Sequence, residues 1–81
     1  MMGGKRFVVG RSYPPRDHGY DPVKVIKRTD KSIRVERWYG GSIWWMRIKH
    51  DAELNEYCVD STAPKNWRDV FTYSADDWVK E

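Results

Sequence analysis

The fold of this chain is decided by residues 23–39, which read VKVIKRTDKSIRVERWY. Two runs of β-branched residues alternating with charged ones flank the pair Asp30-Lys31. A period of two is typical of half-buried β-strands, and a short polar break between two such runs predicts a β-hairpin. Because Lys31 is poorly suited to a positive φ, the loop is expected to be longer than two residues.

Two further strands are predicted after Gly40-Gly41. Residues 42–49, SIWWMRIK, are rich in β-formers and are expected to form a central strand. Residues 56–61, EYCVDS, alternate again, and the polar segment between the two runs would complete a second hairpin, which Pro64 ends. We therefore expect a mainly β fold of about five strands: a small SH3-like or OB-like barrel is favoured, and a small open antiparallel sheet is the alternative.

The two ends of the chain are less regular. Residues 1–22 are expected to form an irregular arm with one short strand at Phe7-Val8-Val9, ahead of a single small β domain over residues 23–81. Near the C-terminus we expect a turn followed by a short strand at Val70-Phe71-Thr72-Tyr73.

A short helix is the expected ending of the chain. Ser74 has the spacing of a helix N-cap, with acidic residues in the first turn after it. So short a helix is unstable alone in water, so we expect a C-terminal helical turn over residues 75–81 only if Trp78 and Val79 dock on the sheet.

Strand alternation assigns the side chains to two faces. One face is apolar and is expected to form the core; it holds Val23, Val25, Ile33, Val35, Trp44, Met46, Ile48, Tyr57 and Val59. The other face is mixed; it holds Lys24, Ile26, Arg28, Arg34, Glu36, Trp38, Ile43, Trp45, Arg47, Lys49, Glu56, Cys58 and Asp60. The mixed face can be buried only if the sheet curls into a barrel or if the arm and tail cover it.

On the mixed face, basic side chains alternate with aromatic rings. The candidate nucleic-acid-binding residues are Lys24, Arg28, Arg34, Trp38, Trp45, Arg47 and Lys49. Lys and Arg pair with phosphates while unstacked bases lie on aromatic rings, so this pattern predicts binding of single-stranded nucleic acid. In the alternative, Trp45 belongs to a second core beneath the arm and tail. The acidic Glu36, Glu56 and Asp60 argue against a uniform phosphate-binding surface.

The net charge of +3 conceals an uneven distribution. Residues 1–50 hold twelve Lys and Arg against four Asp and Glu, a net +8, whereas residues 51–81 hold three against eight, a net −5. Either a basic face attracts a polyanion while an acidic end keeps the protein soluble, or the two parts pair across a sheet and cancel.

The chain is short for a catalytic cleft, and its 81 residues contain no phosphate-binding loop, dinucleotide-binding motif or metalloprotease motif. Cys58 lies inside a strand and is interpreted as a quiet thiol, and His50-Asp51 does not match a known metal spacing. We expect a non-enzymatic binding module without metal or cofactor. A protein–protein interaction module or a self-associating structural protein is the alternative.

No apolar run predicts a membrane span or signal peptide, so no membrane partner and a cytoplasmic location are expected.

Several segments resemble small β-rich proteins encoded by phages and mobile elements of gut bacteria, most of which have no assigned function. These segments are residues 24–29 (KVIKRT), 45–51 (WMRIKHD), 55–57 (NEY) and 64–69 (PKNWRD), so the resemblance covers about residues 23–75 and leaves the arm unmatched. It implies a mobile-element accessory protein, a class that includes nucleic-acid binders and inhibitors of host defence. It assigns a role to no residue.

Overall fold

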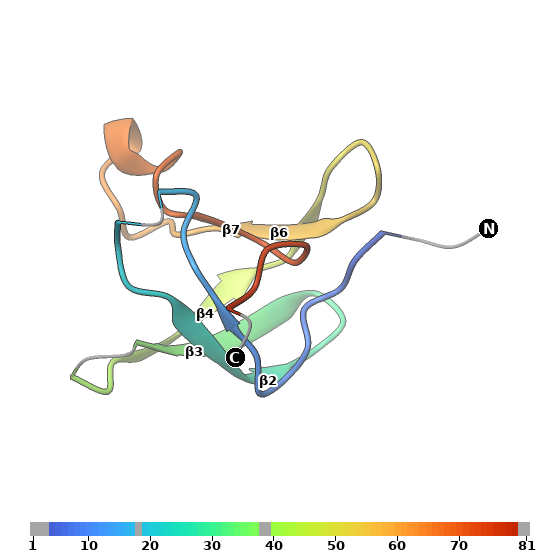
Figure 1. Cartoon of the computed structure of the whole chain (residues 1–81), viewed down its shortest axis with the longest axis horizontal. Coiled ribbons are helices and arrows are strands. Elements are labelled where there is room, and N and C mark those ends of the chain that lie inside the picture. The colour runs from blue at the N-terminus through green and yellow to red at the C-terminus, as the bar shows by residue number, and fades with distance from the viewer. Residues whose placement is uncertain (1–3, 18, 38–39, 80–81) are drawn as a thin grey trace.

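The computed structural model describes residues 4–17, 19–37 and 40–79. In this part of the chain two antiparallel sheets account for nearly all regular structure (Figure 1). A four-stranded sheet has the order β1-β2-β3-β4, with bounds Ser12–Tyr13, Val23–Arg28, Ser32–Arg37 and Ile43–Arg47. A three-stranded sheet has the order β5-β6-β7, with bounds Lys49–His50, Glu56–Val59 and Thr72–Ser74. The mainly β, antiparallel fold is confirmed, and the sheets do not close into a barrel.

The β2–β3 hairpin has the expected position and an unexpected irregularity. Three residues separate the strands, and Thr29 organises them: its Oγ1 accepts hydrogen bonds from the N–H groups of Lys31 and Ser32. Val25 pairs with Val35, but the register then shifts so that Lys27 pairs with Arg34. This β-bulge reverses the alternation in the last part of β2.

The run at residues 42–49 divides into two strands. β4 pairs with β3 and forms an edge of the four-stranded sheet, so the prediction of a central strand was wrong. Ile48 N–H donates to Lys31 O, 2.7 Å away, in the β2–β3 loop. Beyond that loop the run has no further partner on β3, and β5 pairs with β6 in the second sheet instead.

The N-terminal arm joins the two sheets on the opposite side. Its β1 pairs with β2, and the residues that follow turn to β7: Pro15 forms a bridge with Tyr73, and Arg16 N–H donates to Thr72 O at 2.9 Å. The arm contains a short strand, as expected, but this strand is β1 and does not lie at residues 7–9, because Phe7 inserts into the core while Val8 and Val9 remain exposed.

The core lies between the two sheets. It comprises Phe7, Tyr13, Val23, Val25, Ile33, Val35, Met46, Ile48, Cys58, Tyr73 and Ala75, with Trp44, Phe71 and Trp78 packed against it. The expected core positions on β2, β3 and β4 are confirmed, with Trp44 only partly buried.

The predicted orientation of β6 was wrong. Glu56 and Cys58 point inward, where Cys58 is opposite the buried Tyr73, whereas Tyr57 and Val59 are only half-buried. Asp60, which follows β6, is buried as well. Three residues that the sequence placed on the mixed face thus belong to the interior.

The C-terminal segment docks without forming a helix in its described residues. After a short 3-10 helix, η1 (Lys65–Trp67), and β7, the chain turns at Ser74 and runs beside β1, where Val79 N–H donates to Ser12 O at 2.8 Å. The turn and strand were predicted correctly. The helix expected after Ser74 is absent from residues 75–79, because backbone groups there bond to other segments: Ala75 N–H donates to Glu56 O.

Candidate functional site

The outer face of the four-stranded sheet is defined by Lys24, Lys27, Arg34, Glu36, Ile43, Trp45 and Arg47. Pairing across the strands sets these side chains in rows: Lys24 opposite Glu36 and Glu36 opposite Ile43, then Lys27 opposite Arg34 and Arg34 opposite Trp45. Figure 1 shows the three-stranded sheet and the C-terminal segment on the other side of this sheet. The outer face therefore remains open to solvent.

Trp45 is the aromatic platform of the outer face. Its side chain is 47% exposed, and the neighbouring Ile43 is 46% exposed. The Arg34 guanidinium carbon lies 5.8 Å from the centre of the Trp45 ring, within the range of a cation–π interaction. Trp45 is thus not part of a second core, which was the alternative left open by the sequence.

The bulge in β2 changes which cation lies beside this platform. Because the register shifts after Val25, Lys27 pairs with Arg34 on the outer face and is exposed. Arg28 instead pairs with Ile33 and points toward the core side of the sheet. The sequence therefore assigned Arg28 to this surface and missed Lys27, since nothing in the residue pattern marks the bulge.

The other candidate residues are divided between several locations. Lys24, Arg34, Trp45 and Arg47 share the outer face, as expected. Lys49 lies on β5 in the second sheet, opposite Tyr57. Trp38 lies outside the described residues. Trp44, the neighbour of Trp45, packs against the core instead.

The acidic residues that opposed a phosphate-binding surface are largely absent from it. Glu56 and Asp60 are 3% and 6% exposed and lie inside the molecule. Among the described side chains of the outer face, Glu36 is the one acid, beside Lys24, Lys27, Arg34 and Arg47. The outer face is therefore more basic than the sequence predicted.

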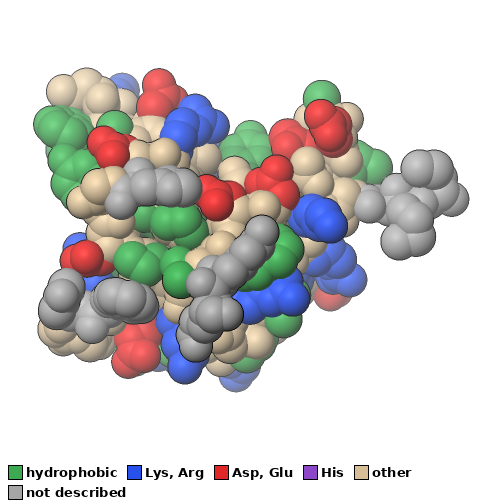
Figure 2. All heavy atoms as spheres, viewed as in Figure 1, with side chains coloured by type: hydrophobic (Ala, Val, Ile, Leu, Met, Phe, Trp, Pro, Cys, Tyr) green, Lys and Arg blue, Asp and Glu red, His purple; other side chains and the backbone are tan. Residues whose placement is uncertain are grey.

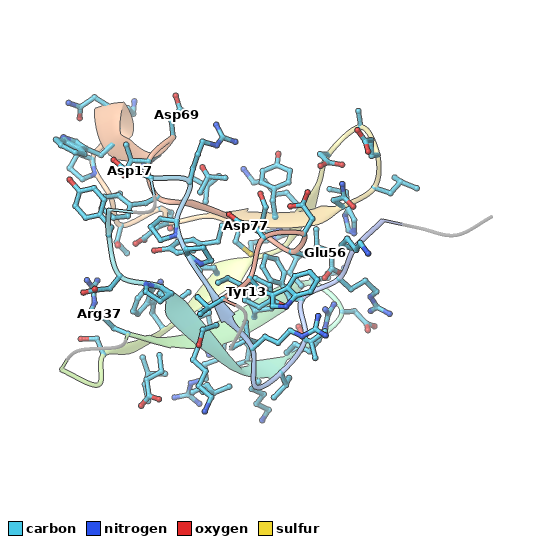
Figure 3. The ribbon with its side chains drawn as sticks, viewed as in Figure 1. Tyr13, Asp17, Arg37, Glu56, Asp69 and Asp77 are labelled. Atoms are coloured by element: carbon cyan, nitrogen blue, oxygen red, sulfur yellow. The ribbon has the colours of Figure 1, made fainter. Side chains whose placement is uncertain are left out.

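Glu56 is the centre of a buried ion pair that the sequence did not reveal. Its Oε1 accepts hydrogen bonds from Arg28 Nη1 at 2.8 Å and Phe7 N–H at 2.8 Å, and its Oε2 accepts from Arg28 Nη2 at 3.0 Å. Arg28 Nη1 also donates to Phe7 O at 2.8 Å. Figure 3 labels Glu56 where the second sheet meets the arm. The ion pair thus connects β2, β6 and the arm.

The protonation of this pair follows from its contacts. Burial raises the pKa of Glu56, but hydrogen bonds from Arg28 and from the Phe7 N–H, with the charges of Arg28 and Arg6, outweigh burial and hold that pKa below its ordinary value. The hydrogen bond to Glu56 likewise raises the pKa of Arg28. The two groups are both charged at neutral pH and form an ion pair with each other.

The uneven charge of the sequence corresponds to the two sheets. The basic first part of the chain supplies the four-stranded sheet, and the acidic remainder supplies β6, β7 and the loops around them. In Figure 2 most visible Lys and Arg side chains lie on the lower right and most visible Asp and Glu on the upper half. Within the described ranges, the ion pairs between the two parts converge on Glu56, from Arg6 and Arg28.

The described residues give no sign of a reactive thiol or of a metal site. Burial, and then the charge of Glu56, raise the pKa of the Cys58 thiol to about 12, so the thiol is protonated at neutral pH. Over the described ranges, no three His, Cys, Asp or Glu side chains lie close enough together to hold a metal ion. Nor does any helix in this part of the chain have the length and apolar character needed to cross a bilayer.

No protein-family model, curated protein or solved structure matches this chain. Its function is therefore inferred from the geometry and charge of its described residues.

Proposed function

We propose that this protein is a small binding module whose outer face holds single-stranded nucleic acid. The observation that carries the proposal is Trp45, half-exposed on the edge strand β4, with Arg34 against its ring, Arg47 on the same strand, and Lys24 and Lys27 on β2 of the same face. A base stacks on the exposed part of the indole while the cations pair with the phosphates on either side.

The spacing of the strands suits this arrangement. Adjacent strands lie about 4.8 Å apart, so Arg34 is one strand away from Trp45 and Lys27 is two. The phosphates that flank one stacked base can therefore reach a cation while the nucleic acid stays in contact with the sheet. Such contacts carry little base specificity, because every base has a π-face and every nucleotide a phosphate.

Binding of a fluorescein-labelled strand of thymidines, followed by anisotropy at two salt concentrations, tests the proposal. The wild-type protein is expected to bind at micromolar concentrations and to weaken as salt rises. Trp45→Ala should lose about tenfold in affinity, because base stacking on an aromatic ring contributes about 1–3 kcal/mol.

Trp67→Ala is the matched control. Trp67 is 43% exposed and lies on η1, away from the four-stranded sheet, so its removal should leave the affinity unchanged. The absence of binding at tens of micromolar, or equal losses in the two variants, would refute the proposal.

A protein-interaction module is the second candidate, and the open edge of β4 favours it. Arg37 N–H donates to Ser42 O and Ile48 N–H donates to Lys31 O, so the even-numbered residues of this run face β3. By the alternation of an antiparallel ladder, the backbone groups of Ile43, Trp45 and Arg47 point to the open edge, where an added strand could pair.

Sedimentation velocity distinguishes this candidate from the first. Edge pairing with a second copy would produce a dimer that persists without nucleic acid, and a Trp45→Pro variant, which lacks the outward N–H, would abolish it. An accessory role on a phage or mobile element, as the sequence resemblance implies, is compatible with either candidate.

A further inference from the structure

A cavity of about 360 Å³ lies between the sheets, where β2 begins and β3 ends. Its lining includes Val23 and Arg37 from the four-stranded sheet. On the other side it includes Tyr73 from β7 and Asp60, the residue after β6. Figure 3 shows Arg37 at the end of the four-stranded sheet, on the same side of the view as η1. The volume of the cavity is at the lower end of the roughly 300–1,000 Å³ that is typical of small-molecule sites. The cavity therefore suits one ring system rather than a peptide.

Aromatic side chains form part of the cavity wall. Tyr20 and Phe71 both line it, with their ring centres 5.0 Å apart. Trp67 supports Tyr20 from outside through an edge contact at 6.5 Å. Tyr20 is 41% exposed although it lies in this aromatic cluster. A flat ligand entering the cavity can therefore cover an aromatic surface that water now contacts.

Asp60 supplies a fixed carboxylate to the same cavity. Its side chain is nearly buried, and its Oδ1 accepts hydrogen bonds from Thr62 N–H at 2.9 Å and Thr62 Oγ1 at 2.6 Å. These bonds use one oxygen and set the orientation of the carboxylate. Among the hydrogen bonds of the described residues, none reaches Oδ2, which leaves an acceptor for a ligand.

Arg37 supplies the complementary donors. Its guanidinium carbon lies 5.2 Å from the centre of the Trp44 ring, and its side chain lines the cavity that Asp60 also lines. Stacking on an indole holds the planar fork of the guanidinium in one orientation. The cavity therefore presents the buried Asp60 carboxylate and the Arg37 guanidinium beside aromatic walls, with the exposed Asp21 at its lining as well.

We propose that this cavity binds a guanine base. Guanine carries two donors, N1–H and the N2 amino group, on the edge that a carboxylate recognises, and two acceptors, O6 and N7, that an arginine recognises. Adenine presents an acceptor at N1 and an amino donor at C6, which places an acceptor against the carboxylate and a donor against the arginine. The proposal does not depend on the outer face, since the base can come from a free nucleotide or from a strand.

Two-dimensional NMR titrations with guanosine and adenosine monophosphates test it. The two nucleotides carry the same phosphate, so a difference between them reports the base. Guanosine monophosphate should shift the resonances of Tyr20, Asp60 and Phe71 at millimolar concentrations. Adenosine monophosphate should bind at least about tenfold more weakly, because it sets an acceptor against the buried Asp60 carboxylate and a donor against the Arg37 guanidinium.

Asp60→Asn is the diagnostic variant. It keeps Oδ1 for Thr62 but replaces the second oxygen by a donor, so the preference for guanine should disappear. Asp69→Asn, which removes an exposed charge outside this lining, should retain it. If Asp60→Asn fails to fold, Arg37→Gln serves instead, since Arg37 is exposed and its loss should also remove the preference. Equal binding of both nucleotides by the wild type, or a guanine preference that survives both Asp60→Asn and Arg37→Gln, would overturn the proposal.

The source of the base is decided by a strand of thymidines with one central guanosine. If the base comes from a strand, this strand binds at least about tenfold more tightly than the all-thymidine strand, in wild type and in Trp45→Ala alike. If the guanosine adds nothing while the free nucleotide still binds, the ligand is the free nucleotide. Failure of guanosine monophosphate with thymidine binding intact overturns the cavity proposal alone, and the reverse result overturns the outer face alone.

Discussion

At the scale of single residues, Glu56 has the largest structural consequence. It is the buried acceptor for Arg28 and for the Phe7 N–H, so it fastens the arm to both sheets. A charge that loses its partner inside a protein is costly, whereas removal of both partners is much less so. Glu56 therefore stabilises the fold mainly by compensating Arg28.

Glu56→Gln is expected to lower the free energy of unfolding by about 2–3 kcal/mol, because it leaves the Arg28 guanidinium with neutral acceptors only, the introduced amide oxygen and Phe7 O. Urea denaturation measures the change. The double variant Glu56→Leu/Arg28→Met should recover much of that loss. A loss in Glu56→Gln below about 0.5 kcal/mol would show that the pair contributes no more than an ordinary surface substitution.

The same carboxylate predicts a pH dependence. Since folding lowers the pKa of Glu56 from its ordinary 4.5, its contribution is fully present above that value and is lost as pH falls through the folded pKa. Wild type should therefore lose stability below about pH 4.5 more steeply than Glu56→Gln, and the two curves should converge. Glu36→Gln leaves the buried pair intact, so its stability should fall with pH as steeply as that of the wild type. If the Glu36→Gln curve instead converged with the wild-type curve at low pH, as the Glu56→Gln curve should, the effect would be general acid denaturation.

Cys58 makes a separate prediction. With 0% exposure and a pKa raised to about 12, the thiol should not react with a disulfide reagent in the folded protein at neutral pH, and should react fully in urea. Absorbance of the released thiolate measures both. Rapid labelling in the absence of denaturant would mean that β6 opens far more readily than its burial indicates.

At the scale of elements, the bulge in β2 separates the roles of two adjacent cations. Lys27→Ala should weaken binding of the thymidine strand by about threefold and leave the urea midpoint unchanged, since the side chain is an exposed phosphate contact. Arg28→Ala should lower the free energy of unfolding by about 2–3 kcal/mol because it strands Glu56. If Lys27→Ala lowered the stability and Arg28→Ala weakened binding instead, β2 would have a regular alternation without the bulge.

The sequence predicts the β2–β3 hairpin well because Val25, Ile33 and Val35 are apolar and their neighbours on the chain are charged. It predicts β6 poorly, because Tyr57, Cys58 and Val59 give apolar residues in both phases and because a glutamate is assumed to face water. Partners distant in sequence, Arg28 and the Phe7 N–H, make the inward phase favourable.

The candidate site is partly predictable for the same reason. Arg34, Trp45 and Arg47 follow from regular alternation on β3 and β4. Lys27 does not, since a bulge is decided by long-range packing rather than by the local pattern. The cavity has no sequence signal at all, because Tyr20, Arg37 and Asp60 meet only through the packing of the two sheets.

At the scale of the whole molecule, the charges of the two sheets are separated. If the four cations of the outer face each release a counterion, log affinity should fall with log salt at a slope of up to about −3, and Lys27→Ala should reduce this slope to about −2. Anisotropy titrations over a series of salt concentrations measure it. A slope near zero would mean that the phosphates are not held by this face.

The docking of the arm also sets the order in which the molecule can assemble. Lys5 N–H donates to Asn55 Oδ1 and Phe7 N–H to Glu56, fifty and forty-nine residues away along the chain. A ribosome therefore releases the arm long before its partners exist, while the β2–β3 hairpin can form from neighbouring residues alone. The strands that carry most of the outer face are thus made early, and the interior closes only when β6 arrives.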